Sequence, residues 1–74
     1  MITMYMYSNK IQIPFSELDN HPLEVVSDIR KSAENNNLTF TKELEEDTYK
    51  ITGDKSDMYG FLHELILHNN IMLI

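Results

Sequence analysis

The first fifteen residues, MITMYMYSNKIQIPF, contain two runs of alternating apolar and polar side chains on either side of Ser8-Asn9. If the chain turns back there, directly opposed positions share one face of a hairpin. The six apolar residues that then lie together are Ile2, Met4, Met6, Ile11, Ile13 and Phe15. A shift by one residue would scatter this set, so we predict strands over 2–7 and 10–14 in that register. Asn tolerates the positive φ that the two-residue turn requires.

The opposite face of this hairpin carries polar and aromatic side chains. Tyr5, Tyr7 and Lys10 lie there together and form the first candidate partner-binding surface. Tyr is enriched in protein interfaces because it buries a large area at a low entropic cost. Cross-strand packing on a half-exposed sheet would account for the same tyrosines without a partner. Pro14 lacks an amide donor, so the second strand ends there or lies at a sheet edge.

A helix is predicted over residues 22–35. Its apolar residues recur at helical spacing within one arc: Pro22, Val25, Val26, Ile29 and Ala33. Asp19 or Asn20 can cap its start, and Pro22 suits its first turn. Three consecutive Asn residues, 35–37, end it because Asn accepts the left-handed conformation.

A second hairpin is predicted over residues 38–52. The alternating apolar residues are Leu38, Phe40, Leu44, Tyr49 and Ile51, with a turn at 45–47. Carboxylates gather at this turn and continue beyond it, and the candidate acidic surface comprises Glu43, Glu45, Glu46, Asp47, Asp54 and Asp57. The turn can simply be solvated, or the acids can imitate phosphates and occupy a basic groove of another protein.

A second helix is predicted over about 56–68, with Asp54 or Ser56 as its cap. Its core stripe is Met58, Phe61, Leu62, Leu65 and Ile66. The other side carries Gly60, His63 and Leu67, which form a second candidate partner-binding surface. A Gly inside a helix is unfavourable, so close approach of another backbone would explain Gly60. Residues 71–74, IMLI, indicate a short buried strand that pairs within its own chain or with a neighbour.

Together these elements predict one α+β domain over residues 1–74. The order is ββαββαβ, in a two-layer sandwich with an antiparallel or mixed sheet of four or five strands and two helices on one face. The alternative treats the opening segment as one strand and has the βαββαβ order of ferredoxin-like domains.

Composition excludes several classes of function. Acids outnumber Lys plus Arg by twelve to six, which gives a formal charge of −6 and argues against direct nucleic-acid binding. There is no Cys, which excludes disulfides, thiolate metal sites and cysteine nucleophiles. No apolar run approaches the ~20 residues of a membrane helix, and the basic start of a secretory signal is missing. We expect a cytoplasmic protein, in the host cytoplasm if phage-encoded, that does not act at a membrane.

The sequence also lacks motifs for catalysis or cofactor binding. His63 and His68 are five residues apart, whereas a zinc pair on a helix needs a spacing of three or four. Glu64 and His68 share a helix face, but two ligands do not complete a site. Gly53 and Gly60 are too far apart for a phosphate-binding loop. We therefore expect no enzymatic activity, no metal and no cofactor.

The leading hypothesis is a small non-enzymatic protein-binding module, an inhibitor or regulator of a larger protein, that forms a homodimer. One alternative is an acidic nucleic-acid mimic that occupies a basic groove of a nucleic-acid-binding protein. Another is a dimeric small-molecule sensor. Short, acidic chains rich in Asn and Ile are often encoded by phages or mobile elements, which is a compositional association only.

Overall fold

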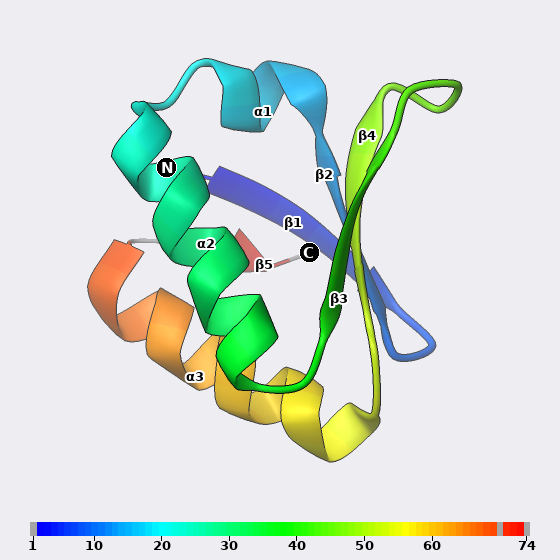
Figure 1. Cartoon of the computed structure of the whole chain (residues 1–74), viewed down its shortest axis with the longest axis vertical. Helices are drawn as coiled ribbons and strands as arrows, with labels where there is room; N and C mark the ends of the chain where they lie inside the picture. The colour runs from blue at the N-terminus through cyan, green and yellow to red at the C-terminus, as the bar shows by residue number, and fades with distance from the viewer. Residues whose placement is uncertain (1, 70, 74) are drawn as a thin grey trace.

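The sheet of the protein has five strands in the order β3-β4-β2-β1-β5. The structure is a computed structural model that describes the backbone of residues 2–69 and 71–73 and the side chains of residues 2–67. The strands are β1 (Ile2–Tyr7), β2 (Lys10–Pro14), β3 (Thr39–Glu43), β4 (Thr48–Thr52) and β5 (Ile71–Leu73). The helices are α1 (Phe15–Asp19), α2 (Leu23–Asn35) and α3 (Lys55–Asn69), and all three lie on one side of the curved sheet (Figure 1).

The predicted α+β class and two-layer arrangement are confirmed. The strand and helix order is ββαββαβ with one short helix added, α1, so the alternative that fuses β1 and β2 into one strand is wrong. Neighbouring strands are antiparallel except β1 and β5, which are parallel, so the sheet is mixed. The helices in the described part of the chain all fall short of the length and hydrophobicity that a membrane span requires.

The first hairpin forms in the predicted register. Met6 pairs with Ile11, and Tyr7 pairs with Lys10. Ser8 and Asn9 both have positive φ, 46° and 65°, as a two-residue turn of type I′ requires. This turn matches the right-handed twist of the strands. The apolar residues of the alternating pattern therefore form one buried face of the hairpin, and the polar and aromatic residues form one open face. β2 ends at Pro14 as expected, although it lies inside the sheet and not at an edge.

Apolar side chains from the sheet and the helices form one core between the two layers. Its buried members are Ile2, Met4, Ile11, Ile13, Leu18, Ile29, Ala33, Leu38, Tyr49, Ile51, Met58, Phe61, Leu62 and Leu65. Met6 and Phe15 are partly buried and pack against this cluster. The six apolar residues of the opening segment therefore all contribute to the core, although Phe15 does so from α1 rather than from a strand.

The short helix α1 was not predicted, and it changes how α2 begins. Leu18 is fully buried and anchors the single turn to the core. The predicted cap is wrong: the N-cap of α2 is Pro22, with no side-chain cap hydrogen bond. Asp19 and Asn20 are engaged in α1 instead, where Asn20 Nδ2 donates to the Ser16 carbonyl over 2.5 Å. Pro22 itself is exposed and does not belong to the buried arc.

The end of α2 follows the prediction. Asn37 has a positive φ of 61°, and the Leu38 amide donates to the Ala33 carbonyl over 2.9 Å. The second hairpin, β3–β4, also forms, and its turn includes Asp47 with a φ of 56°. Leu44, expected in the apolar alternation, is exposed in this turn. The carboxylates beside Leu44 need solvent, so the turn lies outside the core and Leu44 is exposed with it.

α3 spans one residue more at each end than predicted. The Met58 amide donates to the Asp54 carbonyl over 2.9 Å, which places Asp54 at the start of the helix. Met58, Phe61, Leu62 and Leu65 are buried as predicted, but Ile66 is 47% exposed, so the core stripe is narrower than expected. Residues 71–73 form β5 and pair with β1 of the same chain. The predicted burial of residues 71–74 lies outside the described side chains.

Candidate functional site

The face of the sheet that points away from the helices carries the predicted tyrosine surface. Tyr5 and Tyr7 are 43% and 48% exposed, and Tyr7 lies directly opposite Lys10. Strand pairing adds two residues to this surface. Gln12 of β2 lies opposite Tyr5 of the neighbouring strand β1 and also opposite Lys50 of the other neighbour, β4. We call these five residues, Tyr5, Tyr7, Lys10, Gln12 and Lys50, the tyrosine face. Figure 1 shows the helices only on the opposite side of these strands.

One residue of the tyrosine face, Lys50, takes part in an ion pair. Lys50 Nζ lies 2.7 Å from Glu46 Oε2. This hydrogen-bonded contact raises the pKa of Lys50, and the nearby charge of Glu43 adds to the effect. The contact directs the Lys50 ammonium toward Glu46 in the β3–β4 turn. With two phenols, an amide and two ammonium groups, the face offers flat apolar area together with hydrogen-bond donors.

The second predicted surface, Gly60, His63 and Leu67, does not form one unit, because Gly60 packs against Asn36 of the same chain. A Cβ at Gly60 would lie 2.9 Å from Asn36 Oδ1. Asn36 Nδ2 in turn donates to the Ser32 carbonyl over 2.8 Å, and Ser32 Oγ donates to Glu64 Oε2 over 2.5 Å. The missing side chain of Gly60 therefore lets the end of α2 pack closely against α3. This contact within the chain explains the glycine without the backbone of another protein.

The remaining members of that surface, His63 and Leu67, lie on a broader exposed strip of α3. Tyr59, Ile66 and Leu67 are 54%, 47% and 66% exposed, and His63 is exposed among them. Lys55 Nζ lies 5.9 Å from the centre of the Tyr59 ring, within the range of a cation–π contact. We call the exposed residues Lys55, Ser56, Tyr59, His63, Ile66 and Leu67 the α3 outer face.

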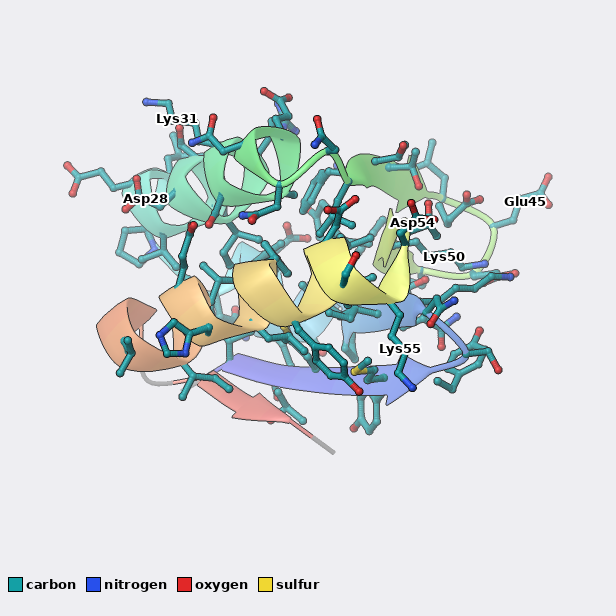
Figure 2. The ribbon with its side chains drawn as sticks, turned by 90° about the horizontal axis from the view of Figure 1, so that it is seen from below. Asp28, Lys31, Glu45, Lys50, Asp54 and Lys55 are labelled. Carbon is teal, nitrogen blue, oxygen red and sulfur yellow. The ribbon has the colours of Figure 1, made fainter. Side chains whose placement is uncertain are left out.

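The predicted acidic surface is split into two groups. Glu43, Glu45, Glu46 and Asp47 surround the β3–β4 turn, whereas Asp54 and Asp57 lie at the start of α3. The length of β4 separates the groups, which is roughly 17 Å for five residues. Figure 2 shows Glu45 at the hairpin tip and Asp54 beside the beginning of α3. The pairing of Glu46 with Lys50 further reduces the charge at the tip.

No group of three or more His, Cys, Asp and Glu side chains among the described residues is arranged to hold a metal ion. His63 is exposed on the α3 outer face, and Glu64 points toward α2, where it accepts from Ser32. The predicted Glu64–His68 pair lies outside the described residues, because it includes the side chain of His68.

Six residues of these two surfaces were not among the predicted partner-binding residues: Gln12, Lys50, Lys55, Ser56, Tyr59 and Ile66. The predicted hairpin register already places Gln12 opposite Tyr5. The spacing of seven between Tyr59 and Ile66 places them on one side of α3, so the sequence contained a signal for all three residues. Lys50 depends on the pairing of β4 with β2, which no local pattern encodes. Comparisons of the chain with protein-family models, curated proteins and solved structures found no match.

Proposed function

We propose that the protein is a non-enzymatic binding module of the cytoplasm whose tyrosine face docks on a larger protein and regulates it. The observation that carries this proposal is the pair of half-exposed phenols on a sheet face that none of the described helices covers. The rigid strands beneath hold both rings in place before binding, so little conformational entropy is lost on contact.

The chemistry of the face supports a protein partner. The cores of protein interfaces are enriched in Tyr and depleted in Asp and Glu. Tyr5, Tyr7, Lys10 and Gln12 form a part of the face without a carboxylate, and the Glu46 carboxylate at its margin is paired with Lys50. The split of the acidic residues disfavours the nucleic-acid mimic, which needs a continuous row of carboxylates.

The experiment compares capture of a binding partner by three immobilised variants. Tyr5→Thr with Tyr7→Thr removes both rings and retains a residue that favours strands. Leu23→Ala is the matched control, because Leu23 is a large apolar side chain on the helical layer, 85% exposed. A protein captured by the wild type is identified by mass spectrometry, purified, and titrated against each variant by calorimetry.

We expect the Leu23→Ala variant to bind like the wild type and the double Thr variant to bind at least about 30-fold more weakly, as loss of a central aromatic pair does. Circular dichroism confirms that each variant is folded. Equal affinity of all three variants would remove the tyrosine face as the docking surface. Affinity that falls steeply between low and moderate salt would favour the acidic mimic instead.

A further inference from the structure

We infer that α1 is a strap across one end of the molecule, and that it opens together with the β3–β4 turn while the rest of the sheet stays paired. In Figure 1, α1 and this turn lie at the same end of the sheet. The opening is a property of the chain on its own, so it does not depend on the proposed function.

The helix α1 is too short to be stable without its tertiary contacts. It has five residues, and no side chain forms a hydrogen bond at its N-cap. The first turn of a helix fixes several dihedral angles for a single hydrogen bond, so an isolated helix of this length does not persist in water. Leu18 is the one buried residue among the five. α1 is therefore either docked and helical or undocked and unfolded, which makes it a two-state element.

Contacts at both ends of α1 join it to β4 and to the β3–β4 turn. The Phe15 amide donates to the Asp47 carbonyl over 3.2 Å, and the centre of the Phe15 ring lies 4.5 Å from that of Tyr49. At the other end of α1, Asp19 Oδ1 accepts from the Tyr49 hydroxyl over 2.6 Å. Undocking of α1 breaks these contacts and with them the hydrogen bond to the turn, so the two segments open together.

The closed turn has two features that favour opening. Asp47 has a φ of 56°, a conformation that is unfavourable for a residue with a Cβ. Thr48 Oγ1 is buried and has no hydrogen-bond partner among the described residues, which is costly for a hydroxyl group. Thr48 pairs with Pro14 at the end of the β2–β4 ladder, so separation of this pair lets water reach the hydroxyl. The contacts of α1 therefore hold the turn closed against a local cost.

Opening of the strap changes both faces of the sheet. On the helical side it uncovers Leu18 and Tyr49, which are buried in the closed state, and so gives solvent access to this end of the core. On the other side, the turn contains Glu46, whose carboxylate lies 2.7 Å from the Lys50 ammonium. When the turn opens, Glu46 is no longer held beside Lys50, and the tyrosine face then presents an unpaired cation. The strap thereby links the two layers of the molecule.

Amide hydrogen exchange of the folded full chain, resolved by NMR, measures the opening. The His21 amide donates to the Leu18 carbonyl over 3.1 Å and reports on α1, and the Phe15 amide reports on the contact with the turn. The Leu38 amide donates to the Ala33 carbonyl over 2.9 Å and reports on the rest of the molecule. We expect the His21 and Phe15 amides to exchange with the same opening free energy and the Leu38 amide with a larger one.

Three variants test the coupling between the two segments. Tyr49→Phe removes the bond to Asp19, and we expect the His21 amide to exchange about fivefold faster, as the loss of one such hydrogen bond predicts. Asp47→Ala makes the positive φ in the turn less favourable, and we expect about threefold faster exchange of the same amide in α1. Asn9→Ala is the matched control, because Asn9 has a φ of 65° in the hairpin turn at the other end of β2. It should leave the exchange of the His21 amide unchanged.

Several results would overturn the inference. Unchanged exchange of the His21 amide in either Tyr49→Phe or Asp47→Ala would separate α1 from the turn. Equal acceleration by Asn9→Ala would assign the effect to global stability instead of the strap. In the wild type, the same opening free energy for the His21 and Leu38 amides would mean that α1 opens only when the whole chain unfolds.

Discussion

Tyr49 of β4 contacts both α1 and β3. Its ring centre lies 4.5 Å from that of Phe15 and 5.7 Å from that of Phe40, and its hydroxyl donates to Asp19 Oδ1 over 2.6 Å. The hydrogen bond to this carboxylate, with burial and the charge of Asp19, raises the pKa of Tyr49 to about 12, while Arg30 acts in the opposite direction. Tyr49 thereby fastens the unpredicted helix α1 to the sheet.

Replacing Tyr49 by Phe should therefore produce a pH-dependent loss of stability. The raised pKa means that the protonated phenol is favoured in the folded state, so its contribution is complete below pH 10 and is lost as the pH rises toward 12. We expect Tyr49→Phe to cost about 1 kcal/mol at pH 8 and progressively less above pH 10, measured by urea unfolding. A difference between wild type and variant that is the same at pH 8 and pH 11.5 would contradict this account.

Gly60 provides a second test at the scale of single residues. Gly60→Ala should gain about 1 kcal/mol in helix propensity but push the Asn36 side chain away and weaken its bond to the Ser32 carbonyl, so the net change should be small. In an Asn36→Ala background the steric conflict is absent, and the same substitution should stabilise by about 1 kcal/mol. Thermal unfolding of the four variants measures this difference; an equal effect in both backgrounds would show that the contact is irrelevant.

At the scale of elements, the β1–β2 hairpin owes its register to two residues with positive φ, Ser8 and Asn9. Ser is unfavourable in this conformation, whereas Asn-Gly suits it. Ser8→Asn with Asn9→Gly should raise the free energy of unfolding by about 1 kcal/mol, measured by thermal or urea unfolding. Asn9→Ala is the opposing control and should lower it by a similar amount. A loss of stability in the Asn-Gly variant would mean that the turn is of another type.

Elements with a strong local pattern could be predicted from the sequence, and those that depend on tertiary contacts could not. The first hairpin and α2 have clear alternation or helical spacing, and both were predicted to within one residue, although the cap of α2 was not. α1 has five residues, too few to display a helical period, and it exists because Leu18 reaches the core. Ile66 has the spacing of a core residue but lies on the flank of α3 that the sheet leaves uncovered.

The candidate site divides in the same way. Tyr5, Tyr7 and Lys10 come together through a register that the alternation and the Ser8-Asn9 turn determine together, and both features are visible in the sequence. Lys50 joins them only through the pairing of β4 with β2, and the role of Gly60 depends on where the end of α2 falls. Both are contacts between elements far apart along the chain, for which a single sequence carries no direct signal.

At the scale of the whole molecule, the net charge of −6 opposes the compact state, and salt weakens this repulsion. Screening acts over about 10 Å at 0.1 M ionic strength, so added salt reduces the repulsion among the carboxylates of one chain. We expect the free energy of unfolding to rise between 20 and 300 mM NaCl, as measured by urea unfolding. A free energy of unfolding that falls over this range would indicate that attractive ionic contacts such as Lys50–Glu46 outweigh the repulsion.

The parallel pairing of β1 with β5 has a consequence for how the protein is made. The residues of β1, 2–7, leave the ribosome well before those of β5, 71–73. During synthesis the nascent polypeptide can assemble four strands, and one margin of β1 then stays without hydrogen-bond partners until residues 71–73 emerge. Translation that stalls before this point would leave a chain in which this edge of β1 is exposed, and such an unpaired edge is a binding site for a chaperone.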